Sequence, residues 1–307
     1  MTPVSDSGGP SDSPGIDGFL DAIRISPSGS TEHSLTFDAT TGRVPWAKAY
    51  GGDLLAQAVT AGQASVDETR VLHSMHSSFL RPAAVAEKLR YEVELTRDGR
   101  SYSTRQVRAL QGGKVIYIAT LSFQVQEEGI DYAPEMPAVE GPENIPSSQE
   151  YLRSESGDHG LRPPVAEYWS RGRAFDQRHV DGPLYLTTEH DTAGHQAVWV
   201  KAFATLPDSP GIHQAALAYV SDYTILEPSL RVMGTSWSDV GLTTASLDNS
   251  IWFHRPARAD DWLLYVQEAE SVQRGRGLNR GRFFDRAGHL VATVMQEGML
   301  RTERGTS

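Results

Sequence analysis

The residue types that most often mark a reactive centre are scarce in this sequence. None of its 307 residues is cysteine, which removes thiol nucleophiles, disulfides and cysteine-ligated metal sites. No Gly-x-Ser-x-Gly nucleophile elbow occurs, so a serine-nucleophile mechanism is not indicated. His73 and His76 lie three apart in an expected strand, where their side chains should face opposite sides and cannot share a metal. We therefore expect no metal ion and no cofactor.

Two adjacent glycines, Gly51 and Gly52, precede an expected helix. The first N–H groups of a helix have no partner within the helix, so they can bind an anion or a carbonyl oxygen. Glycine also lets a helix start pack closely against strands, and the pattern does not decide between these two interpretations. Asp53 follows as a first-turn charge that the helix dipole favours. Gly51 and Gly52 are therefore candidate substrate-binding residues.

Acidic residues outnumber basic ones, with 39 Asp plus Glu against 28 Lys plus Arg and a net charge of -11. This balance argues against nucleic-acid or anionic-membrane binding, because both require a basic surface. The most basic stretch holds Arg274, Arg276, Arg280 and Arg282. Such a patch can bind phosphate groups, although alternating arginines on a strand are also typical of a solvated surface.

The first half of the chain predicts one helix followed by antiparallel strands. The segment Asp53–Ala64 is rich in Ala and Leu and carries apolar residues on nearly every face, as a buried helix does. In Glu87–Arg97 apolar and charged residues alternate, as in a strand with one buried face, and Asp98-Gly99 supplies a hairpin turn. Further strands are expected at Tyr102–Leu110 and Lys114–Val125.

The second half repeats this order, which indicates an internal duplication. The segment Phe79–Pro82 recurs 174 positions later as Phe253–Pro256, and at an offset of 172 Gln124 corresponds to Gln296. A two-residue deletion in a hairpin turn would account for the change of offset. We expect a helix at His213–Leu226, ended before Pro228, and strands at Ser246–His254, Trp262–Val272, Leu278–Phe284 and His289–Leu300.

A long apolar helix covered by an antiparallel sheet, occurring twice, favours the α+β class and a double hotdog fold, in which each repeat wraps its sheet around a long central helix. Joining two such sheets edge to edge would cover strands that each half alone leaves open. The Ser-, Pro- and Gly-rich start is expected to be poorly ordered. The expected organisation is a poorly ordered segment over 1–34, a first hotdog domain over 35–127, a proline-rich connection over 128–175 and a second hotdog domain over 176–303.

The sequence carries no targeting or membrane signal that we can identify. No window approaches 18 apolar residues, and the first 30 residues lack the basic and apolar regions of a secretory signal. We therefore expect a cytoplasmic protein without membrane insertion.

Six short segments carry a family resemblance. Three lie in the first half, at Leu72–Pro82, Arg97–Tyr102 and Ser122–Gln124, and three in the second, at Ser246–Pro256, Trp262–Tyr265 and Gln296–Gly298. Together they resemble the acyl-CoA thioesterase II family over nearly everything from Gly51 to Arg301, the proline-rich connection excepted. The resemblance implies hydrolysis of acyl-CoA thioesters to free fatty acid and coenzyme A by a directly activated water, without a covalent intermediate.

The family's triad is an Asp, a Thr and a Gln in the second hotdog domain. By resemblance these positions are Asp222, Ser246 and Gln296, with serine in place of threonine. An Asp can accept a proton from water, while a hydroxyl and a carboxamide can hold that water. Serine lacks the β-branch that limits χ1, so we expect looser water positioning and a lower rate. Arg274 and Arg276 would bind the phosphates of coenzyme A.

Two other functions remain open. Enoyl-CoA hydration also occurs on tandem hotdogs, in enzymes that pair an Asp with Asn-Pro and a nearby His, but this sequence contains no Asn-Pro. A catalytically weak acyl-CoA binding protein is the other alternative, because Ser246 departs from the family residue. In each case the expected partners are acyl-CoA and further copies of the chain in a homo-oligomer.

Overall fold

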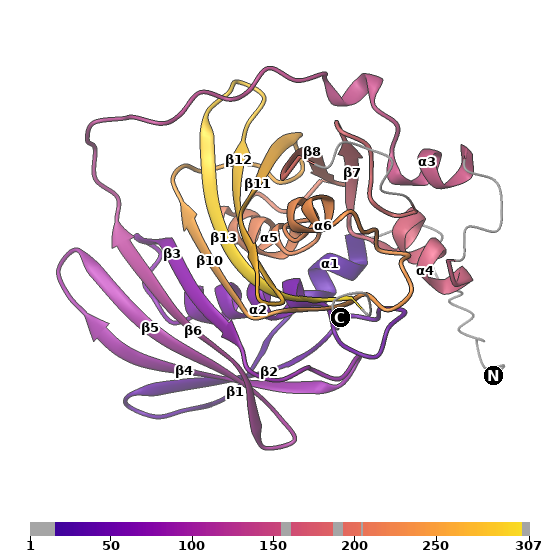
Figure 1. Cartoon of the computed structure of the whole chain (residues 1–307). Helices are drawn as coiled ribbons and strands as arrows, with labels where there is room; N and C mark the ends of the chain where they lie inside the picture. Colours follow the sequence, from indigo (N-terminus) through magenta and orange to yellow (C-terminus); the bar gives the residue numbers. More distant parts are fainter. Residues whose placement is uncertain (1–15, 155–160, 187–192, 204, 303–307) are drawn as a thin grey trace, which may run out of the picture.

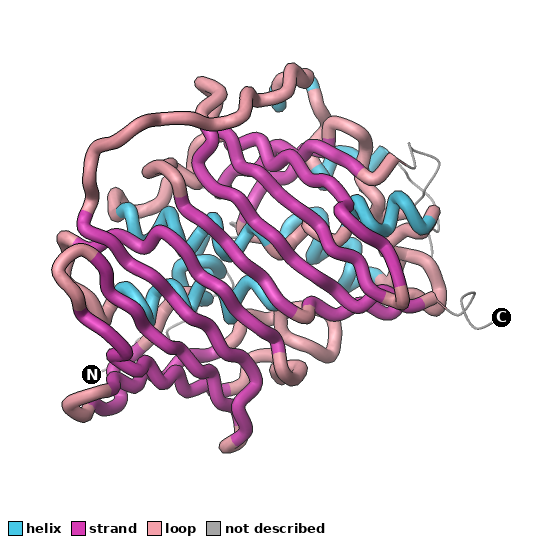
Figure 2. The backbone as a smooth tube through the Cα atoms, turned by 60° about the vertical axis from the view of Figure 1, so that its left-hand side comes forward, coloured by secondary structure: helices cyan, strands magenta, loops and turns pink. Residues whose placement is uncertain are grey.

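The computed structural model describes residues 16–154, 161–186, 193–203 and 205–302. One long antiparallel sheet wraps around a group of helices (Figure 1). Figure 2 shows the strands crossing one side of the molecule, with the helices behind them. The predicted α+β arrangement of an antiparallel sheet over buried helices is confirmed.

The first half contributes six strands in the spatial order β1-β2-β4-β5-β6-β3. The predicted hairpin at Asp98-Gly99 joins β4 to β5, and the expected bounds of β6 match those observed. These strands are β1 (Ser26–Ser30), β2 (Ser34–Thr40), β3 (Arg70–Phe79), β4 (Lys88–Asp98), β5 (Tyr102–Gln111) and β6 (Lys114–Val125).

The second half continues the same sheet in the order β10-β13-β12-β11-β8-β7, with β9 paired to β13. The halves join through β3 and β10, whose pairing runs from Ser74 opposite Trp252 to Ser78 opposite Asp248. The strands are β7 (Phe175–His179), β8 (His195–Ala202), β9 (Thr243–Ser246), β10 (Asp248–Phe253), β11 (Leu263–Gln273), β12 (Arg276–Phe284) and β13 (Leu290–Arg301).

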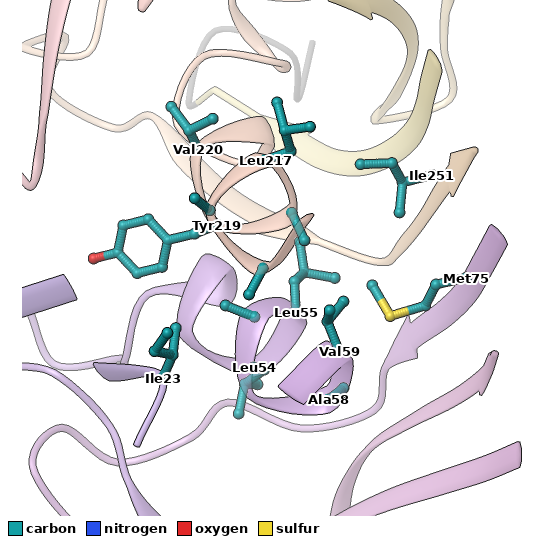
Figure 3. Close-up of a cluster of buried hydrophobic side chains, with 14 of the residues drawn as sticks. Ile23, Leu54, Leu55, Ala58, Val59, Met75, Leu217, Tyr219, Val220 and Ile251 are labelled. Atoms are coloured by element: carbon teal, nitrogen blue, oxygen red, sulfur yellow. The ribbon is translucent and has the colours of Figure 1, made fainter. Parts of the chain in front are cut away.

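Helices α2 (Gly51–Gln63) and α5 (Pro210–Ser221) form the centre of the core. They run antiparallel, because the start of α2 lies against Asp222 after α5 while Gly211 at the start of α5 lies against Gln63. Side chains of both helices meet those of β3 and β10, as Figure 3 shows for Leu55, Met75 and Ile251. The prediction that the first helix is buried is therefore confirmed.

The helix predicted over His213–Leu226 is shorter than expected. It ends at Ser221, and a separate helix, α6 (Glu227–Met233), follows after a turn. Pro228 lies in the first turn of α6, where its missing N–H is no loss, so it starts a helix instead of ending one. The strand expected over Ser246–His254 is likewise divided, because Leu247 separates β9 from β10.

The expectation of poor order over residues 1–34 is wrong from residue 16 onward, while residues 1–15 lie outside the described part. Helix α1 (Ile16–Ala22) and strand β1 are formed here. Phe19 is 1% exposed and makes edge contacts with the rings of Phe175 and Tyr219. A few apolar side chains in a polar segment were enough to bury this helix against the core.

The proline-rich connection forms short helices and packs against both halves. These are η1 (Pro142–Asn144), α3 (Ser148–Ser154), α4 (Pro163–Glu167) and η2 (Tyr168–Gly172), a π-helical turn. The predicted helical piece near Gln149–Arg153 is thus confirmed as α3. Tyr168 and Trp169 contact Trp46 and Trp237 in an aromatic cluster. No helix in the described ranges is long and apolar enough to cross a membrane.

Replacing Phe19 with Ala should test whether α1 is part of the folded core. We expect Phe19→Ala to lower the free energy of unfolding by about 3 kcal/mol or more, because a buried aromatic ring is lost and a cavity remains. Urea unfolding measures the change. Ile130→Ala, which removes a fully exposed side chain, is the control and should leave stability nearly unchanged. Equal stability of the two variants would show that α1 does not hold the fold.

Candidate active site

Asp222, Ser246 and Gln296 come from three separate elements and meet at one point. Asp222 caps the C-terminus of α5, Ser246 ends β9, and Gln296 lies within β13. The Ser246 hydroxyl donates to Asp222 Oδ1 at 3.0 Å, and Gln296 Nε2 donates to the same oxygen at 2.7 Å. Gln296 Nε2 also lies 3.0 Å from Ser246 Oγ. The three polar groups therefore form a closed hydrogen-bonded set.

Asn249 is a fourth polar residue at this point, and sequence reasoning did not single it out. Its side chain, on β10, is fully buried and donates from Nδ2 to Gln296 Oε1 at 2.7 Å. This bond fixes which end of the Gln296 carboxamide faces Asp222, so that the Nε2 group is the one presented to the carboxylate. Asn249 lies inside the family-like segment Ser246–Pro256, which was the available signal.

Gly51 and Gly52 let the start of α2 approach Asp222 more closely than any other residue would allow. A Cβ on Gly51 would lie 2.5 Å from Asp222 Oδ2, and one on Gly52 would lie 2.4 Å from the carbonyl oxygen of Tyr219. The backbone N–H of Gly52 lowers the pKa of the Asp222 carboxyl. Close packing of the helix start is therefore confirmed, while substrate binding by Gly51 and Gly52 stays a prediction.

The environment of Asp222 opposes its ionisation. Burial raises the pKa of Asp222 to about 6, while the hydrogen bonds from Gln296, Ser246 and Gly52 act in the opposite direction. Tyr50, Tyr117 and Tyr265 surround it, and burial also raises the pKa of each of these phenols. A carboxylate with a pKa near 6, held by three donors, can accept a proton at neutral pH.

Asp53 is a second buried carboxylate on the first turn of α2. It is 1% exposed and accepts a hydrogen bond from the Gly42 N–H at 2.7 Å. Burial raises its pKa to about 7, the Gly42 bond lowers it, and the nearby Asp222 charge adds to the rise. The helix dipole that was expected to favour this charge is therefore outweighed by desolvation.

The arginines predicted to bind phosphate lie at the hairpin between β11 and β12. Arg274 occupies the left-handed turn position with a φ of 51°, and Arg276 pairs with Glu297 at 2.8 Å. Arg280 and Arg282 both contact Glu268. Glutamates thus offset most of the positive charge of this patch. The role of Arg274 and Arg276 in substrate binding stays a prediction.

The two histidines of β3 face the same side of the sheet, which corrects the expectation that they point apart. A β-bulge between Leu72 and Ser74 shifts the alternation at His73. His73 then hydrogen-bonds Ser122, and His76 hydrogen-bonds Ser250, both on the side away from the helices. Among the described residues, no three His, Asp or Glu side chains gather as metal ligands.

The opposite end of the helix pair repeats the backbone of the site without counterparts of Asp222 and Gln296. Ala64 follows α2 where Asp222 follows α5, and a Cβ on Gly211 would lie 2.7 Å from Gln63 Oε1. On the sheet, Phe79 pairs with Tyr117, and its equivalent in the second half, Phe253, pairs with Ala292. Four residues further along each strand, Leu121 of β6 therefore occupies the position that Gln296 has on β13. The predicted equivalence of Gln124 and Gln296 is therefore wrong. Gln124 is on the outer face, paired with the exposed Tyr102.

Asp53 should make stability depend on pH. Its pKa is higher in the folded protein than the ordinary 3.8, so the stability given by its protonated form is present at pH 4 and lost as the pH rises through about 7. Asp53→Asn, which keeps an oxygen for the Gly42 N–H, should therefore raise the free energy of unfolding at pH 8 by on the order of 2 kcal/mol and far less at pH 4. Urea unfolding at both pH values measures this. The exposed Glu68→Gln is the control, and a destabilised Asp53→Asn at pH 8 would contradict the assignment.

Comparison with known proteins places both halves in one family. Residues 172–299 match the family model described as acyl-CoA thioesterase, and residues 41–124 match that of the acyl-CoA thioesterase N-terminal domain. The chain is 34% identical over 254 residues to acyl-CoA thioesterase 2 of Haemophilus influenzae, covering 82% of this chain and 87% of that protein. It is 31% identical over 310 residues to acyl-coenzyme A thioesterase 8 of Rattus norvegicus, covering 98% and 96%.

Solved structures agree in fold. The crystal structure of the acyl-CoA thioesterase II TesB2 from Mycobacterium marinum matches with a TM-score of 0.71 and 32% identity, over 94% of this chain and 99% of that one. A conserved protein of unknown function from Alicyclobacillus acidocaldarius, described as having a hot dog fold, matches with a TM-score of 0.71 at 19% identity, over 92% and 98%. The fold is thus an α+β hotdog fold, and the chain belongs to the acyl-CoA thioesterase II family.

Proposed function

We propose that this protein hydrolyses acyl-CoA thioesters with one water molecule activated by Asp222, Ser246 and Gln296. The observation that carries the proposal is the closed hydrogen-bonded set of these three side chains at the start of α2. A buried carboxylate with a pKa near 6 is a suitable general base, and the neighbouring hydroxyl and amide can hold a water in place.

The reaction needs no covalent intermediate. The water oxygen attacks the thioester carbonyl carbon while Asp222 accepts its proton, which gives a tetrahedral oxyanion. N–H groups at the start of α2 or the Gln296 amide would stabilise that oxyanion. Collapse breaks the C–S bond, the departing thiolate of coenzyme A takes up the proton, and the carboxylic acid remains. Ser246 takes the role of the family threonine and keeps the hydroxyl that the set requires.

We further propose a double hotdog with one reactive centre per chain. The halves would be hotdog domains over 35–127 and 176–303, joined by the connection over 128–175. The two helices, the continuous sheet and the β3–β10 junction support this division. The apolar Ala64 and Leu121 at the equivalent positions of the first half support a single centre. Gly51, Gly52, Arg274 and Arg276 as substrate contacts, a homo-oligomer and a cytoplasmic location stay predictions.

The experiment that tests the function is release of free thiol from acyl-CoA substrates of short, medium and long chain by the purified chain. We expect turnover without added metal. Asp222→Asn and Gln296→Ala should each lower kcat by about a hundredfold or more, because a base or a water-orienting amide is lost. Gln124→Ala is the matched control on the outer face and should keep near wild-type kcat. Saturable binding without turnover would instead favour the acyl-CoA binding alternative.

Gly51 gives a second test of the same site. We expect Gly51→Ala to lower kcat by at least about tenfold, because its Cβ would need the space of Asp222 Oδ2 and must displace the carboxylate. Gly129→Ala is the control, since a Cβ at Gly129 meets no atom within 4 Å. Thiol release measures both, with circular dichroism to confirm folding. A folded Gly51→Ala variant with normal kcat would separate Asp222 from the chemistry.

A further inference from the structure

The connection between the halves ends in a buried arginine. Arg173 lies between η2 and β7 and is 6% exposed. Its Nη1 donates to Gln177 Oε1 at 2.7 Å and to the Tyr185 hydroxyl at 2.9 Å, while its Nε has no hydrogen-bond partner among the described residues. No described carboxylate lies within salt-bridge distance of it. The charge of the buried Glu227 acts on Arg173 from beyond that distance. A buried cation with only neutral hydrogen-bond partners is costly unless further contacts stabilise it.

Aromatic rings provide that stabilisation. The guanidinium carbon lies 4.8 Å from the centroid of the Tyr223 ring, 5.5 Å from that of Tyr185 and 5.9 Å from that of Trp169. Trp169 and Tyr185 are stacked on each other at 4.9 Å. Cation–π attraction is strongest where the cation is desolvated, as it is here. The shortest of the three contacts is with Tyr223, the residue that follows Asp222.

Tyr223 connects Arg173 to the active site. Its ring stacks on that of Tyr50, with centroids 4.7 Å apart and planes 17° apart. The Tyr50 hydroxyl donates to the Tyr219 carbonyl oxygen at 2.6 Å, and its ring fills the space above Gly52, 2.2 Å from where a Cβ would be. Arg173, Tyr223 and Tyr50 therefore form a continuous stack that ends on Gly52, whose backbone N–H lowers the pKa of Asp222. The adjacent Gly51 shows how close this helix start lies to the carboxylate, because a Cβ there would be 2.5 Å from Asp222 Oδ2.

We propose that Arg173 is a positioning residue that holds the Tyr223–Tyr50 stack, and through it the Gly52 N–H, against the Asp222 carboxylate. The inference rests on the proposed function only in taking Asp222 as the base. Without the guanidinium, one face of Tyr223 loses its contact, Tyr50 is free to tilt, and the Gly52 N–H moves relative to the carboxylate. The connection between the halves would then help to set the pKa of Asp222 as well as join the domains.

A purely structural role for Arg173 would lower the amount of folded protein without changing Asp222. The positioning role predicts a different readout, because a weaker hydrogen bond to the charged form raises the pKa of the carboxyl. The ionisable groups around Asp222 are Asp53 on α2, Tyr50 before it, Tyr117 on β6 and Tyr265 on β11. Burial keeps the phenols neutral below pH 9, so among the described residues Asp53 is the one neighbour of Asp222 that titrates in the same range.

The test uses Arg173→Met, which keeps a long apolar stem, and Arg173→Lys, which keeps the charge but loses the planar stacking group. Each should move the acidic limb of the kcat/KM profile upward by about 0.5 to 1 pH unit and lower kcat by about tenfold, with a smaller change in KM. Arg178→Met is the matched control. Arg178 lies over the Trp262 ring at 5.0 Å, in a different cluster, so its loss should leave the acidic limb in place.

A second readout does not require hydrolysis. The ¹³C carboxyl signal of Asp222 in aspartate-labelled protein, identified as the signal missing from Asp222→Asn, reports the pKa of this group alone. We expect its midpoint to rise in folded Arg173→Met or Arg173→Lys and to stay in place in Arg178→Met. An unchanged midpoint in a folded Arg173 variant overturns the proposal. Absence of thiol release by the wild-type protein would instead overturn the proposed function and leave this titration to decide the positioning role.

Discussion

The approach of the start of α2 to the end of α5 is the contact on which the site depends. Asp222 caps α5, where the negative end of that helix disfavours a carboxylate, yet it also lies at the positive end of α2. The two glycines reduce the distance between these ends to a backbone contact. The antiparallel arrangement of the helix pair therefore places the α2 dipole and the Gly52 N–H where they oppose in part the burial that raises the pKa of Asp222.

The sheet supplies the remaining groups from adjacent strands. Ser246 opposes Gly298 on β13, two residues from Gln296, so one strand pair fixes the distance between the hydroxyl and the carboxamide. Asn249 comes from β10, which continues along the same edge of β13 as β9, and donates to the Gln296 carboxamide. The register shifts by one residue at Leu247, between β9 and β10, so that Ser246 and Asn249, three residues apart, can both face Gln296. An irregularity in the sheet thus serves the site directly.

Sequence reasoning predicted the elements better than the contacts between them. Apolar alternation located β4, β5 and β6 closely, because a half-buried strand imposes a period of two on its residues. The closeness of Asp222 to Ser246 and Gln296, 24 and 74 residues away, is a tertiary property that no local pattern reports, and those positions came from family resemblance. Asn249 and Arg173 were not predicted, because neither contacts Asp222 directly: Asn249 contacts Gln296, and Arg173 contacts Tyr223.

The misplacement of Gln124 has a specific cause. An offset of 172 was inferred from residue identities, whereas the strand pairing gives 175 on β6 and β13. An odd difference turns every side chain to the other face of the sheet, so a polar residue assigned to the core belongs on the surface. Identity between repeats is thus a weaker guide than strand register wherever bulges or turn lengths differ.

Comparison of the two ends of the helix pair shows how the site lowers the stability of the fold. Both ends bring a glycine of one helix against a polar side chain at the end of the other, but Gln63 is neutral and satisfied by Gln214, whereas Asp222 is an acid in a desolvated position. Asp53 adds a second buried carboxyl beside it. A neutral amide and apolar residues suit a helix junction that only has to be stable. The end that keeps carboxylates gives up stability at neutral pH, which is the range in which an ionised Asp222 can act as a base.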